Sequence, residues 1–428
     1  MTTLLAGATQ VVTCRGPARA RRGGEMADLD VIDGGGVVMA DDGTIAAVGP
    51  EPELRQAFPG ATVEEVEGVL FPGFVDCHTH AVFGAARLAD HERRARGVGY
   101  KEIAAAGGGI LASVRDVRER GSDELKALMG GRLERLLAAG TTTVEVKSGY
   151  GLSLDAELKQ LDVIRSLGSG RPTLVPTFLG AHEVPPDYRD DPDGYVELVV
   201  NEMLPEVERR GLARFCDVFC EPGVFTPAQS RVILSAARRH GLALKLHADE
   251  LDGSGGAELA VELGAVSADH LAAISPRGIE ALGRAPATLA VLLPGTMLFL
   301  GRSARAPARQ LIDAGAAVAL ATDFNPGSSP GMSLPLMAMM GVSQLGMVPA
   351  EAVTAITVNA AASIGEASRR GQLAPGFAAD VVLVALADWR ELPYWYGANL
   401  VSRVWIAGAA CHPRLGPINS KSSPESTQ

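Results

Sequence analysis

Residues 71–80 read FPGFVDCHTH, a short apolar run that ends in the polar residues Asp76, His78 and His80. Seven more runs of this kind follow, and segments with helical periodicity separate them. The eight runs are FPGFVDCHTH (71–80), GTTTVEVKSGYG (140–151), PTLVPTFLGAH (172–182), ARFCDVFCE (213–221), LALKLHADE (242–250), AVSADHL (265–271), ATLAVLLPG (287–295) and AVALATDFNPG (317–327). Eight alternating strand and helix units predict an α/β fold, the (β/α)8 TIM barrel.

Two of the separating segments show clear helical character, SDELKALMGGRLERLLAAG (122–140) and TPAQSRVILSAARRHG (226–241). The second begins with Thr226 followed by Pro227 and closes on Gly241, which are the residues expected at the two ends of a helix. Both segments are therefore predicted to be helices on the outside of the barrel.

The two ends of the chain differ from its middle. Residues 1–70 and 371–416 contain alternating apolar patches and turn signals without long helical periods. They predict a small composite β-sandwich made from both ends, beside a barrel of residues 71–370. The polar residues 417–428 are predicted to form a flexible tail.

The composition excludes several classes of protein. Of 428 residues, 47% are hydrophobic and 21% are charged, which argues against a disordered or fibrous chain. A net charge of −11 argues against a nucleic-acid partner. The most apolar stretch, 289–300, is interrupted by Pro294 and Gly295 and is shorter than the about 18 residues of a membrane span. We expect neither nucleic acid nor membrane as a partner.

Five cysteines are present, an odd number, widely spread and without a preceding signal peptide, which predicts the reducing cytoplasm. Cys216 and Cys220 lie four apart in one apolar run and are interpreted as core residues, because no second Cys or His pair completes a zinc-site spacing. The basic run Arg15–Arg22 is interpreted as a solvated loop, and no function is assigned to it.

Of the eight histidines, five lie at the ends of the predicted strands, where the active sites of such barrels are built. His78 and His80 are two residues apart and share a face. His247 ends the fifth run and Asp323 the eighth, and barrel closure makes the eighth strand a neighbour of the first. Three imidazoles and a carboxylate suit Zn²⁺, with Fe²⁺ also possible. Such a cation lowers the pKa of a bound water from about 15.7 toward roughly 7.

Glu250 and His270 flank the position predicted for that water, and with Asp323 they are the candidates for moving its proton. The alternative for Glu250 is a surface acid at a helix N-terminus. The alternative for His270 is a structural hydrogen bond at a strand end.

The motifs around these residues resemble those of a known family. The HxH of PGFVDCHTH, HADE (247–250) and TDFNPG (322–327) resemble the metal-dependent amidohydrolase superfamily. Further motifs narrow the resemblance to the imidazolonepropionase family, and it covers nearly the whole chain. They are HAVFGAAR (80–87), KSGYGL (147–152), FLGAH (178–182), VFCEPGVF (218–225) and DFNPGSS (323–329).

The resemblance implies a cytoplasmic enzyme of histidine degradation that hydrolyses the cyclic amide of a small molecule, 4-imidazolone-5-propanoate, to N-formimidoyl-L-glutamate. It implies a homodimer with one divalent or trivalent metal ion per subunit, Zn²⁺ or Fe. The metal ligands would be His78, His80, His247 and Asp323. The substrate contacts would be Arg87, Tyr150, His182 and Glu250, with Asn325, Gly327 and Ser328 completing the pocket.

A propanoate group needs a cation, and the forked guanidinium of Arg87 matches a carboxylate, although a surface arginine is the alternative. Many superfamily members bridge two metal ions with a modified lysine at the end of the fourth strand. Here Cys220 and Glu221 stand there, which predicts a single ion, and Lys147 is interpreted as structural or as support for the ligands.

Two other functions fit part of the pattern. A cytosine- or guanine-type deaminase would share the metal ligands and the pair of Glu250 and His270, whereas Arg87 and KSGYGL argue against it. A non-catalytic barrel kept for binding or as a scaffold would be expected to have lost metal ligands, and all four are present.

Overall fold

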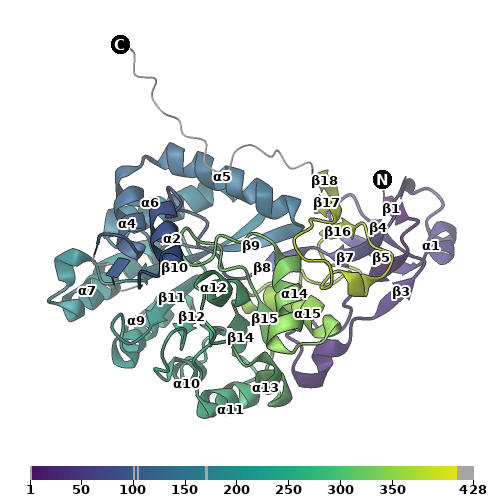
Figure 1. Cartoon of the computed structure of the whole chain (residues 1–428). Helices are drawn as coiled ribbons and strands as arrows, with labels where there is room; N and C mark the ends of the chain where they lie inside the picture. Colours follow the sequence, from purple (N-terminus) through teal and green to yellow (C-terminus); the bar gives the residue numbers. More distant parts are fainter. Residues whose placement is uncertain (1, 100–101, 104–105, 169–171, 412–428) are drawn as a thin grey trace.

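The centre of the molecule is a ring of eight parallel strands in chain order, from β8 to β15 (Figure 1). The structure is a computed structural model that describes residues 2–99, 102–103, 106–168 and 172–411. The strands are β8 Phe74–Asp76, β9 Thr141–Lys147, β10 Thr173–Ala181, β11 Phe215–Cys220, β12 Ala243–Ala248, β13 Ser267–His270, β14 Leu289–Leu292 and β15 Val318–Leu320. Each lies within one of the eight predicted runs, so the predicted (β/α)8 barrel is confirmed.

The ring closes just beyond the ends of β8 and β15. The backbone N–H of Asp323 donates to the carbonyl of His78 over 3.0 Å, and that of His80 donates to the carbonyl of Phe324 over 2.8 Å. These bonds place the first and the last strand side by side, as predicted, and bring Asp323 next to both histidines.

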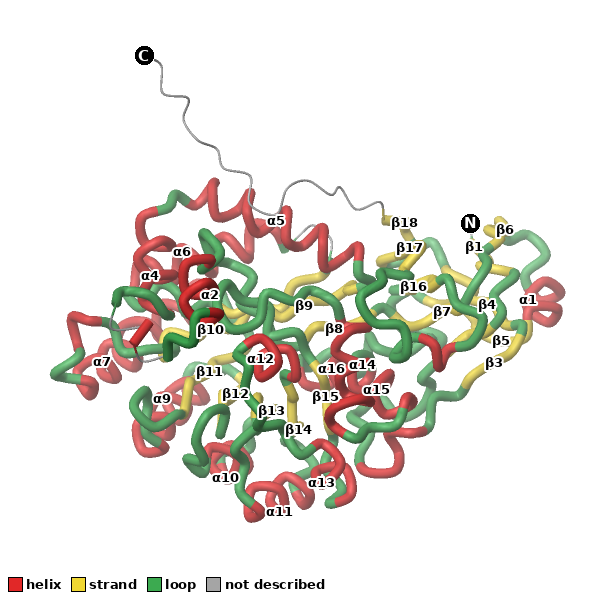
Figure 2. The backbone as a smooth tube through the Cα atoms, in the orientation of Figure 1, coloured by secondary structure: helices red, strands yellow, loops and turns green. Residues whose placement is uncertain are grey.

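Helices cover the outside of the ring, where Figure 2 shows the strands surrounded by helices. Residues of β11 alternate accordingly: Cys216, Val218 and Cys220 face outward into the large apolar core, whereas Asp217 faces inward. The interpretation of Cys216 and Cys220 as core residues is confirmed, and both are free thiols.

The predicted helix at 226–241 is α9, and Thr226 accepts a hydrogen bond from the backbone N–H of Gln229 at its start. The α-helices are α1 Glu51–Ala57, α2 Leu88–Ala95, α4 Ile110–Glu119, α5 Ser122–Ala138, α6 Leu154–Leu167, α7 Pro192–Leu198, α8 Leu204–Arg210, α9 Pro227–Arg239, α10 Gly256–Glu262, α11 Pro276–Arg284, α12 Pro294–Phe299, α13 Ala308–Asp313, α14 Leu334–Leu345, α15 Pro349–Ala355 and α16 Val358–Ser363. The 3-10 helices are η1 Gly23–Ala27, η2 Pro186–Tyr188 and η4 Trp389–Glu391, and η3 Val199–Met203 is a π-helix.

Both ends of the chain form two further sheets at one side of the barrel (Figure 1). One has the order β5-β4-β1-β6 and the other β18-β17-β16-β7-β2-β3. The strands are β1 Thr3–Ala6, β2 Gln10–Val12, β3 Val31–Asp33, β4 Gly35–Met39, β5 Ile45–Pro50, β6 Thr62–Glu65, β7 Val69–Pro72, β16 Val381–Val384, β17 Val401–Ile406 and β18 Ala409–Cys411.

The two ends meet where β7 pairs antiparallel with β16, from Val69 opposite Val384 to Pro72 opposite Val381. One apolar cluster joins residues of both sheets, among them Leu5 of the first and Trp405 of the second. The predicted composite β-structure is therefore confirmed. Its residue limits stay a prediction, and residues 412–428, with the predicted tail, lie outside the described residues.

The interpretation of the basic run Arg15–Arg22 as a solvated loop is correct only for its first part. Residues 15–19 are exposed, as expected of a solvated loop. Arg21, however, is buried and donates to the carbonyls of Cys14 and Asp28, each over 2.6 Å. Arg22 donates to the carbonyl of Gly283 over 2.8 Å. Gly283 lies near the C-terminal end of α11, one of the helices around the barrel. The end of the run thus fixes the N-terminal segment to the barrel, because a guanidinium can satisfy several carbonyls at once.

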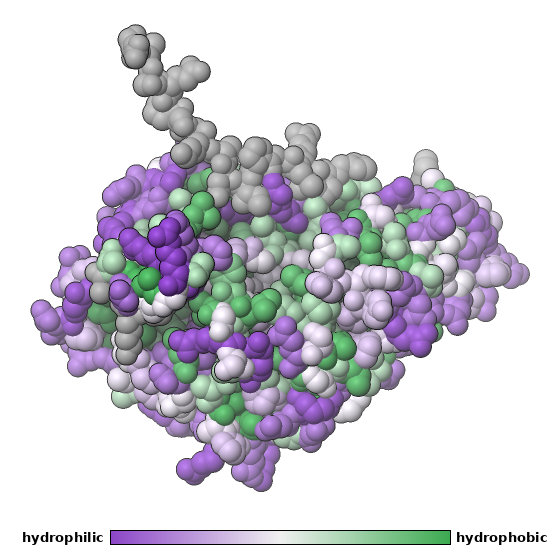
Figure 3. Space-filling model, viewed as in Figure 1, coloured by the Kyte–Doolittle hydropathy of each residue, from purple (hydrophilic) through white to green (hydrophobic). Residues whose placement is uncertain are grey.

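Hydrophilic residues cover much of the visible periphery, whereas apolar residues gather toward the middle of the view in Figure 3. Among the residues that the structure describes, no helix is long and apolar enough to cross a membrane.

We predict that Arg22→Ala lowers the free energy of unfolding by about 1–3 kcal/mol, because it leaves barrel carbonyls without their charged donor. Urea unfolding checks this. The matched control is Arg15→Ala, which removes an exposed ion pair with Asp30 and should change stability by less than about 1 kcal/mol. Equal losses in both variants would contradict the anchoring role of Arg22.

Candidate active site

A cavity of about 280 Å³ opens at the C-terminal ends of the barrel strands. Its lining combines histidines, acids, arginines and a few apolar residues. They are His80, Arg87, Arg94, Gly97, Val98, Gly99, Ile110, Tyr150, His182, Phe219, His247, Glu250, Leu251, His270, Leu300, Arg302, Asp323, Asn325 and Ser328. Side chains from strands far apart in the sequence therefore face one common space.

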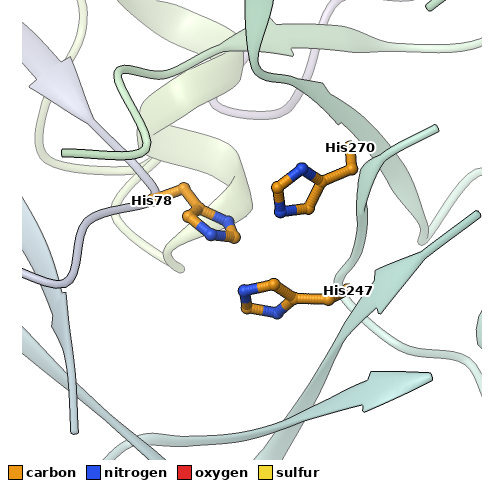
Figure 4. A group of neighbouring side chains, drawn as sticks. All are labelled: His78, His247 and His270. Atoms are coloured by element: carbon orange, nitrogen blue, oxygen red, sulfur yellow. The ribbon is translucent and has the colours of Figure 1, made fainter. Parts of the chain in front are cut away.

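Three imidazoles meet at the inner end of this cavity. The ring of His247 lies 4.5 Å from that of His78 and 5.1 Å from that of His270, measured between ring centres. Figure 4 shows the three rings turned toward one another, His247 and His270 from β12 and β13 and His78 from the segment just after β8. One ligand atom of each lies within 4.8 Å of the others, a spacing that could hold a metal ion.

A second possible group of ligands shares His78. Oδ1 of Asp323 lies 3.6 Å from Nε2 of His78 and 3.5 Å from Nε2 of His80. The other oxygen of Asp323 accepts a hydrogen bond from Thr296 over 2.6 Å, which orients the carboxylate. The four predicted metal ligands thus fall into two groups joined by His78, one with His80 and Asp323 and the other with His247 and His270.

A hydrogen bond at Nδ1 of His78 and a close carboxylate contact at Nδ1 of His247 indicate which ring nitrogen is free. Nδ1 of His78 lies 2.6 Å from a carboxylate oxygen of Asp269, and Nδ1 of His247 lies 3.0 Å from one of Asp217. A carboxylate accepts, so we assign the proton to Nδ1 and a lone pair to Nε2 in both rings. Within the described residues, both Nε2 atoms are buried without a hydrogen-bond partner.

The protonation states also suit a cation. Burial, followed by the charge of Lys147, lowers the pKa of His78 well below its ordinary value, and burial does the same for His80. Proteins present histidine to a metal as a neutral imidazole with an available lone pair, and a carboxylate often orients the ring, as Asp269 does for His78. The residues present therefore fit a bound metal ion.

Charged side chains lie beneath the histidines, inside the barrel. Nζ of Lys147 lies 2.8 Å from Asp217 and 2.9 Å from Glu145, and Nζ of Lys245 lies 3.1 Å from Glu145. Burial would lower the pKa of Lys147, but the surrounding carboxylates, above all Asp217, raise it, so Lys147 is an ammonium. Lys147 thus contacts a carboxylate that lies beside His247, which agrees with its interpretation as support for the ligands.

Sequence reasoning missed four members of that group: Glu145, Asp217, Lys245 and Asp269. A signal was present, because these charged residues stand at alternate positions of otherwise apolar strands, as in TVEVK and LKLH. Alternation places all of them on the inner face of the ring.

Glu250 and His270 lie together at one side of the histidines. Oε2 of Glu250 is 3.6 Å from Nε2 of His270, and both residues line the cavity. The Glu250 side chain is only 11% exposed, so it is not a surface acid. Neither ring nitrogen of His270 has a hydrogen-bond partner in the described part of the chain, so the alternative of a structural hydrogen bond is not supported. Burial first, and then Asp323, raises the pKa of Glu250 well above its ordinary value.

Asp249 holds the loop that carries Glu250. Its backbone has a φ of +50°, a conformation that few residues other than glycine adopt. Its carboxylate accepts from the backbone N–H groups of Ser254 over 2.7 Å, Gly255 over 3.0 Å and Ala257 over 3.0 Å. This residue was not singled out from the sequence, although it lies within the HADE motif.

Arg87 lies at the other side of the cavity. Its side chain is 11% exposed, and Nε and Nη1 are buried without a hydrogen-bond partner among the described residues, so it is not a surface arginine. Nε is 3.9 Å from Asp90. The guanidinium lies against Gly327, where a Cβ atom would stand 1.1 Å from Nη2. A buried guanidinium that keeps unused hydrogen-bond donors beside a carboxylate 3.9 Å away can bind a further anion.

Tyr150 and His182 lie between these two sides. The His182 ring stacks on that of His80, with 5.0 Å between ring centres, and the Tyr150 ring is 5.3 Å from His182. Burial lowers the pKa of His182 to about 3, so the ring is neutral. Its Nδ1 lies 2.9 Å from the carbonyl of Gly149, which leaves Nε2 as a hydrogen-bond acceptor.

The loop after Asp323 is shaped by the side chain of Asn325. Its Oδ1 accepts from the backbone N–H groups of Gly327 over 2.8 Å and Ser328 over 2.7 Å. Asn325 and Ser328 line the cavity, whereas Gly327 lies behind Arg87. The loop is thus a turn held by Asn325 and a wall of the cavity, and direct contact of Gly327 with a ligand stays a prediction.

Comparison with known proteins places this site in a family context. Residues 69–411 match the model described as "Amidohydrolase family", and residues 40–61 match "Imidazolonepropionase-like composite domain, bacteria". The chain is similar to "Imidazolonepropionase" of Solibacter usitatus, with 47% identity over 95% of this chain and 97% of that protein. It is 49% identical to "Imidazolonepropionase" of Geobacillus kaustophilus over 94% of this chain and 96% of that protein.

A solved structure of a triazine hydrolase variant is also similar, with a TM-score of 0.72 and 18% identity over 97% of each chain. At this identity the likeness concerns the fold.

We predict that Asp249→Ala lowers the free energy of unfolding by about 1–3 kcal/mol, because it leaves buried backbone donors unsatisfied. Faster hydrogen exchange at the amides of residues 254–257 should accompany the loss. Asp252→Ala, an exposed position of the same loop, is the control and should leave both measurements unchanged. Unchanged exchange in Asp249→Ala would contradict the role given to this carboxylate.

Proposed function

Because the chain belongs to the amidohydrolase family, and within it to the imidazolonepropionases, we propose that its barrel site opens the ring of 4-imidazolone-5-propanoate. The product would be N-formimidoyl-L-glutamate, an intermediate of histidine degradation. One observation carries the proposal: one cavity is lined both by imidazoles and by Arg87, and among the described residues these groups keep buried nitrogens without a hydrogen-bond partner. A small molecule with a hydrolysable ring and an anionic tail matches both kinds of group.

The proposed metal ligands are His78, His80, His247 and Asp323, and the ion is Zn²⁺ or Fe. When bound, such an ion supplies hydroxide from water at neutral pH and polarises a carbonyl group. We propose one ion per subunit, since β11 ends at Cys220 without a lysine that could bridge two ions. The orienting contacts of Asp269 and Asp217 support His78 and His247 in this role.

Hydrolysis adds the oxygen of water to the ring carbonyl carbon and breaks the bond from this carbon to the ring nitrogen. A proton must leave the water and reach the departing nitrogen. Glu250, His270 and Asp323 are the proposed carriers, because all three line the cavity beside the ligands. The contact of 3.6 Å between Glu250 and His270 allows a proton to pass between them when a substrate brings them closer.

The remaining residues would hold the substrate. Arg87 offers two nitrogens in a fork that fits the propanoate carboxylate. His182 presents an acceptor at Nε2 for a ring N–H, and the stacked ring of His80 behind it fixes its orientation. Tyr150, Glu250, Asn325, Gly327 and Ser328 complete the proposed substrate site.

A deaminase is the nearest alternative reaction, since it would use the same ligands together with Glu250 and His270. Arg87 favours a substrate with a carboxylate over a neutral nucleobase, because its buried Nε and Nη1 have no hydrogen-bond partner within the described part of the chain. A non-catalytic scaffold is disfavoured because the four ligands lie together. The proposal also includes a homodimer, as the resemblance implies, and a cytoplasmic location, which the five free cysteines support.

We predict that the purified protein consumes imidazolone propanoate without releasing ammonia, and that chelation abolishes the reaction. His78→Ala should lose both the metal and turnover, because two ligand groups share this ring. Absorbance decay of the substrate, metal analysis and an ammonia assay check this. The control is His240→Ala, which alters a half-buried histidine paired with Glu208 outside the cavity. Turnover by a metal-free protein would disprove the metal-dependent reaction, and ammonia release would favour the deaminase.

We predict that Arg87→Ala raises KM for imidazolone propanoate roughly 10- to 100-fold with a smaller change in kcat, because a charge-assisted contact contributes about 1.5–3 kcal/mol. An imidazolone with a methyl group in place of the propanoate should lose no activity on the same change. Arg93→Ala, an exposed position of α2, serves as the control. An equal loss with both substrates would contradict the assignment of Arg87 to the carboxylate.

A further inference from the structure

We propose that two buried lysines, Lys147 and Lys245, are positioning residues for the metal ligands at the barrel mouth. They would act through the carboxylates that orient two of the histidines. The inference rests on the proposed function, because it concerns how this chain prepares the same metal site. Neither lysine reaches the cavity, so neither is a catalytic residue.

Lys147 acts on His247 through one carboxylate oxygen. Nζ of Lys147 lies 2.8 Å from Oδ2 of Asp217, and the same oxygen lies 3.0 Å from Nδ1 of His247. The other oxygen of Asp217 accepts from the backbone N–H groups of Val218 over 2.8 Å and His247 over 3.2 Å. The carboxylate is therefore held from both sides, and its position determines where the lone pair of His247 points.

Lys245 acts on the strand that carries His78. Its Nζ donates to the carbonyl of Cys77, the residue just before His78, over 3.0 Å. The carboxylate that orients His78 also lies close, because Oδ2 of Asp269 is 3.9 Å from this ammonium and 4.0 Å from that of Lys147. Both lysines thus favour the ionised form of Asp269, which accepts from the His78 ring.

Glu145 joins the two lysines into one unit. Its Oε2 lies 2.9 Å from Nζ of Lys147, and its Oε1 lies 3.1 Å from Nζ of Lys245. Thr177 adds a hydrogen bond to Oε1 from the next strand. Two ammonium groups and three carboxylates therefore form a connected network with no exposed side chain.

Stability alone does not explain this network. Removing charges from water is costly, and apolar side chains of similar volume often stabilise a buried site as well or better. The interior of such barrels is commonly filled by branched apolar residues. In contrast, carboxylates that orient metal-binding histidines change metal affinity by roughly 10- to 100-fold when they are altered. Two carboxylates of the network, Asp217 and Asp269, contact the metal-binding histidines. Through them the charges of the network affect the position of those histidines.

The experiment measures Zn²⁺ affinity directly, with no substrate present. The wild-type protein and Lys147→Met are stripped of metal, and Zn²⁺ is titrated in competition with a chromophoric chelator. We expect Lys147→Met to bind Zn²⁺ roughly 10- to 100-fold more weakly, because Asp217 loses the cation that holds it. Affinity equal to that of the wild type in a folded Lys147→Met would overturn the proposal.

A matched control removes another buried cation. Arg370→Met deletes a guanidinium that pairs with Asp380 and Glu366, outside the lining of the cavity. It should lower stability without changing Zn²⁺ affinity. An equal loss of affinity in this control would mean that the effect of Lys147→Met reflects general destabilisation.

A second variant keeps the test decisive if Lys147→Met does not fold. The double variant Lys147→Met/Asp217→Asn removes one charge of each sign, and we expect it to fold and to bind Zn²⁺ more weakly than the wild type. With Co²⁺ in the site, its visible absorption bands should shift, because the His247 ring is no longer held by a carboxylate. Loss of the fold in both variants, or bands and affinity like those of the wild type, would overturn the inference.

These outcomes separate the inference from the proposed function. If the wild-type protein itself binds no Zn²⁺ or Co²⁺, the proposed metal site fails. If the wild type binds metal and hydrolyses the substrate while the lysine variants bind Zn²⁺ as tightly as the wild type, only the positioning role fails.

Discussion

The contact between His78 and Asp269, at 2.6 Å, is the interaction on which the rest of the site depends. It fixes the proton on Nδ1, and therefore leaves the lone pair of Nε2 directed at Asp323 and toward the space shared with the other imidazoles. The contact requires an ionised carboxylate inside the barrel, and this explains why the two ammonium groups lie beneath it. Burial makes each of these charges costly alone, so they occur only as a group.

The closure of the barrel determines which residues can take part. The backbone bonds between His78 and Asp323 and between His80 and Phe324 join the first strand to the last. Consequently residues more than 240 positions apart in the sequence act as neighbours. Asp249, His270 and Asp323 all have positive φ values at this end of the barrel. Such backbone is tolerated where surrounding contacts fix it, and His270 and Asp323 line the cavity while Asp249 holds its own loop.

Local sequence patterns predicted much of this arrangement. The alternation of apolar runs with helical segments located all eight barrel strands, and the polar residue at the end of each run located His78, His247 and Asp323. Local patterns did not predict which side chains of different strands contact one another inside the barrel. Lys147 and Asp217 lie 70 positions apart in separate runs. The placement of Arg87 against Gly327 depends likewise on a loop whose path follows from tertiary packing.

The same network bears on the number of metal ions. Asp217, Glu145 and Asp269 converge in the barrel interior, and a cluster of carboxylates could in principle attract a second cation. Here the ammonium of Lys147 lies within 4.0 Å of all three. Lys245 compensates two of them further. A divalent ion placed there would lie close to two positive charges, and repulsion within a low-dielectric interior is strong. The lysines therefore favour the proposed single ion at the histidines above them.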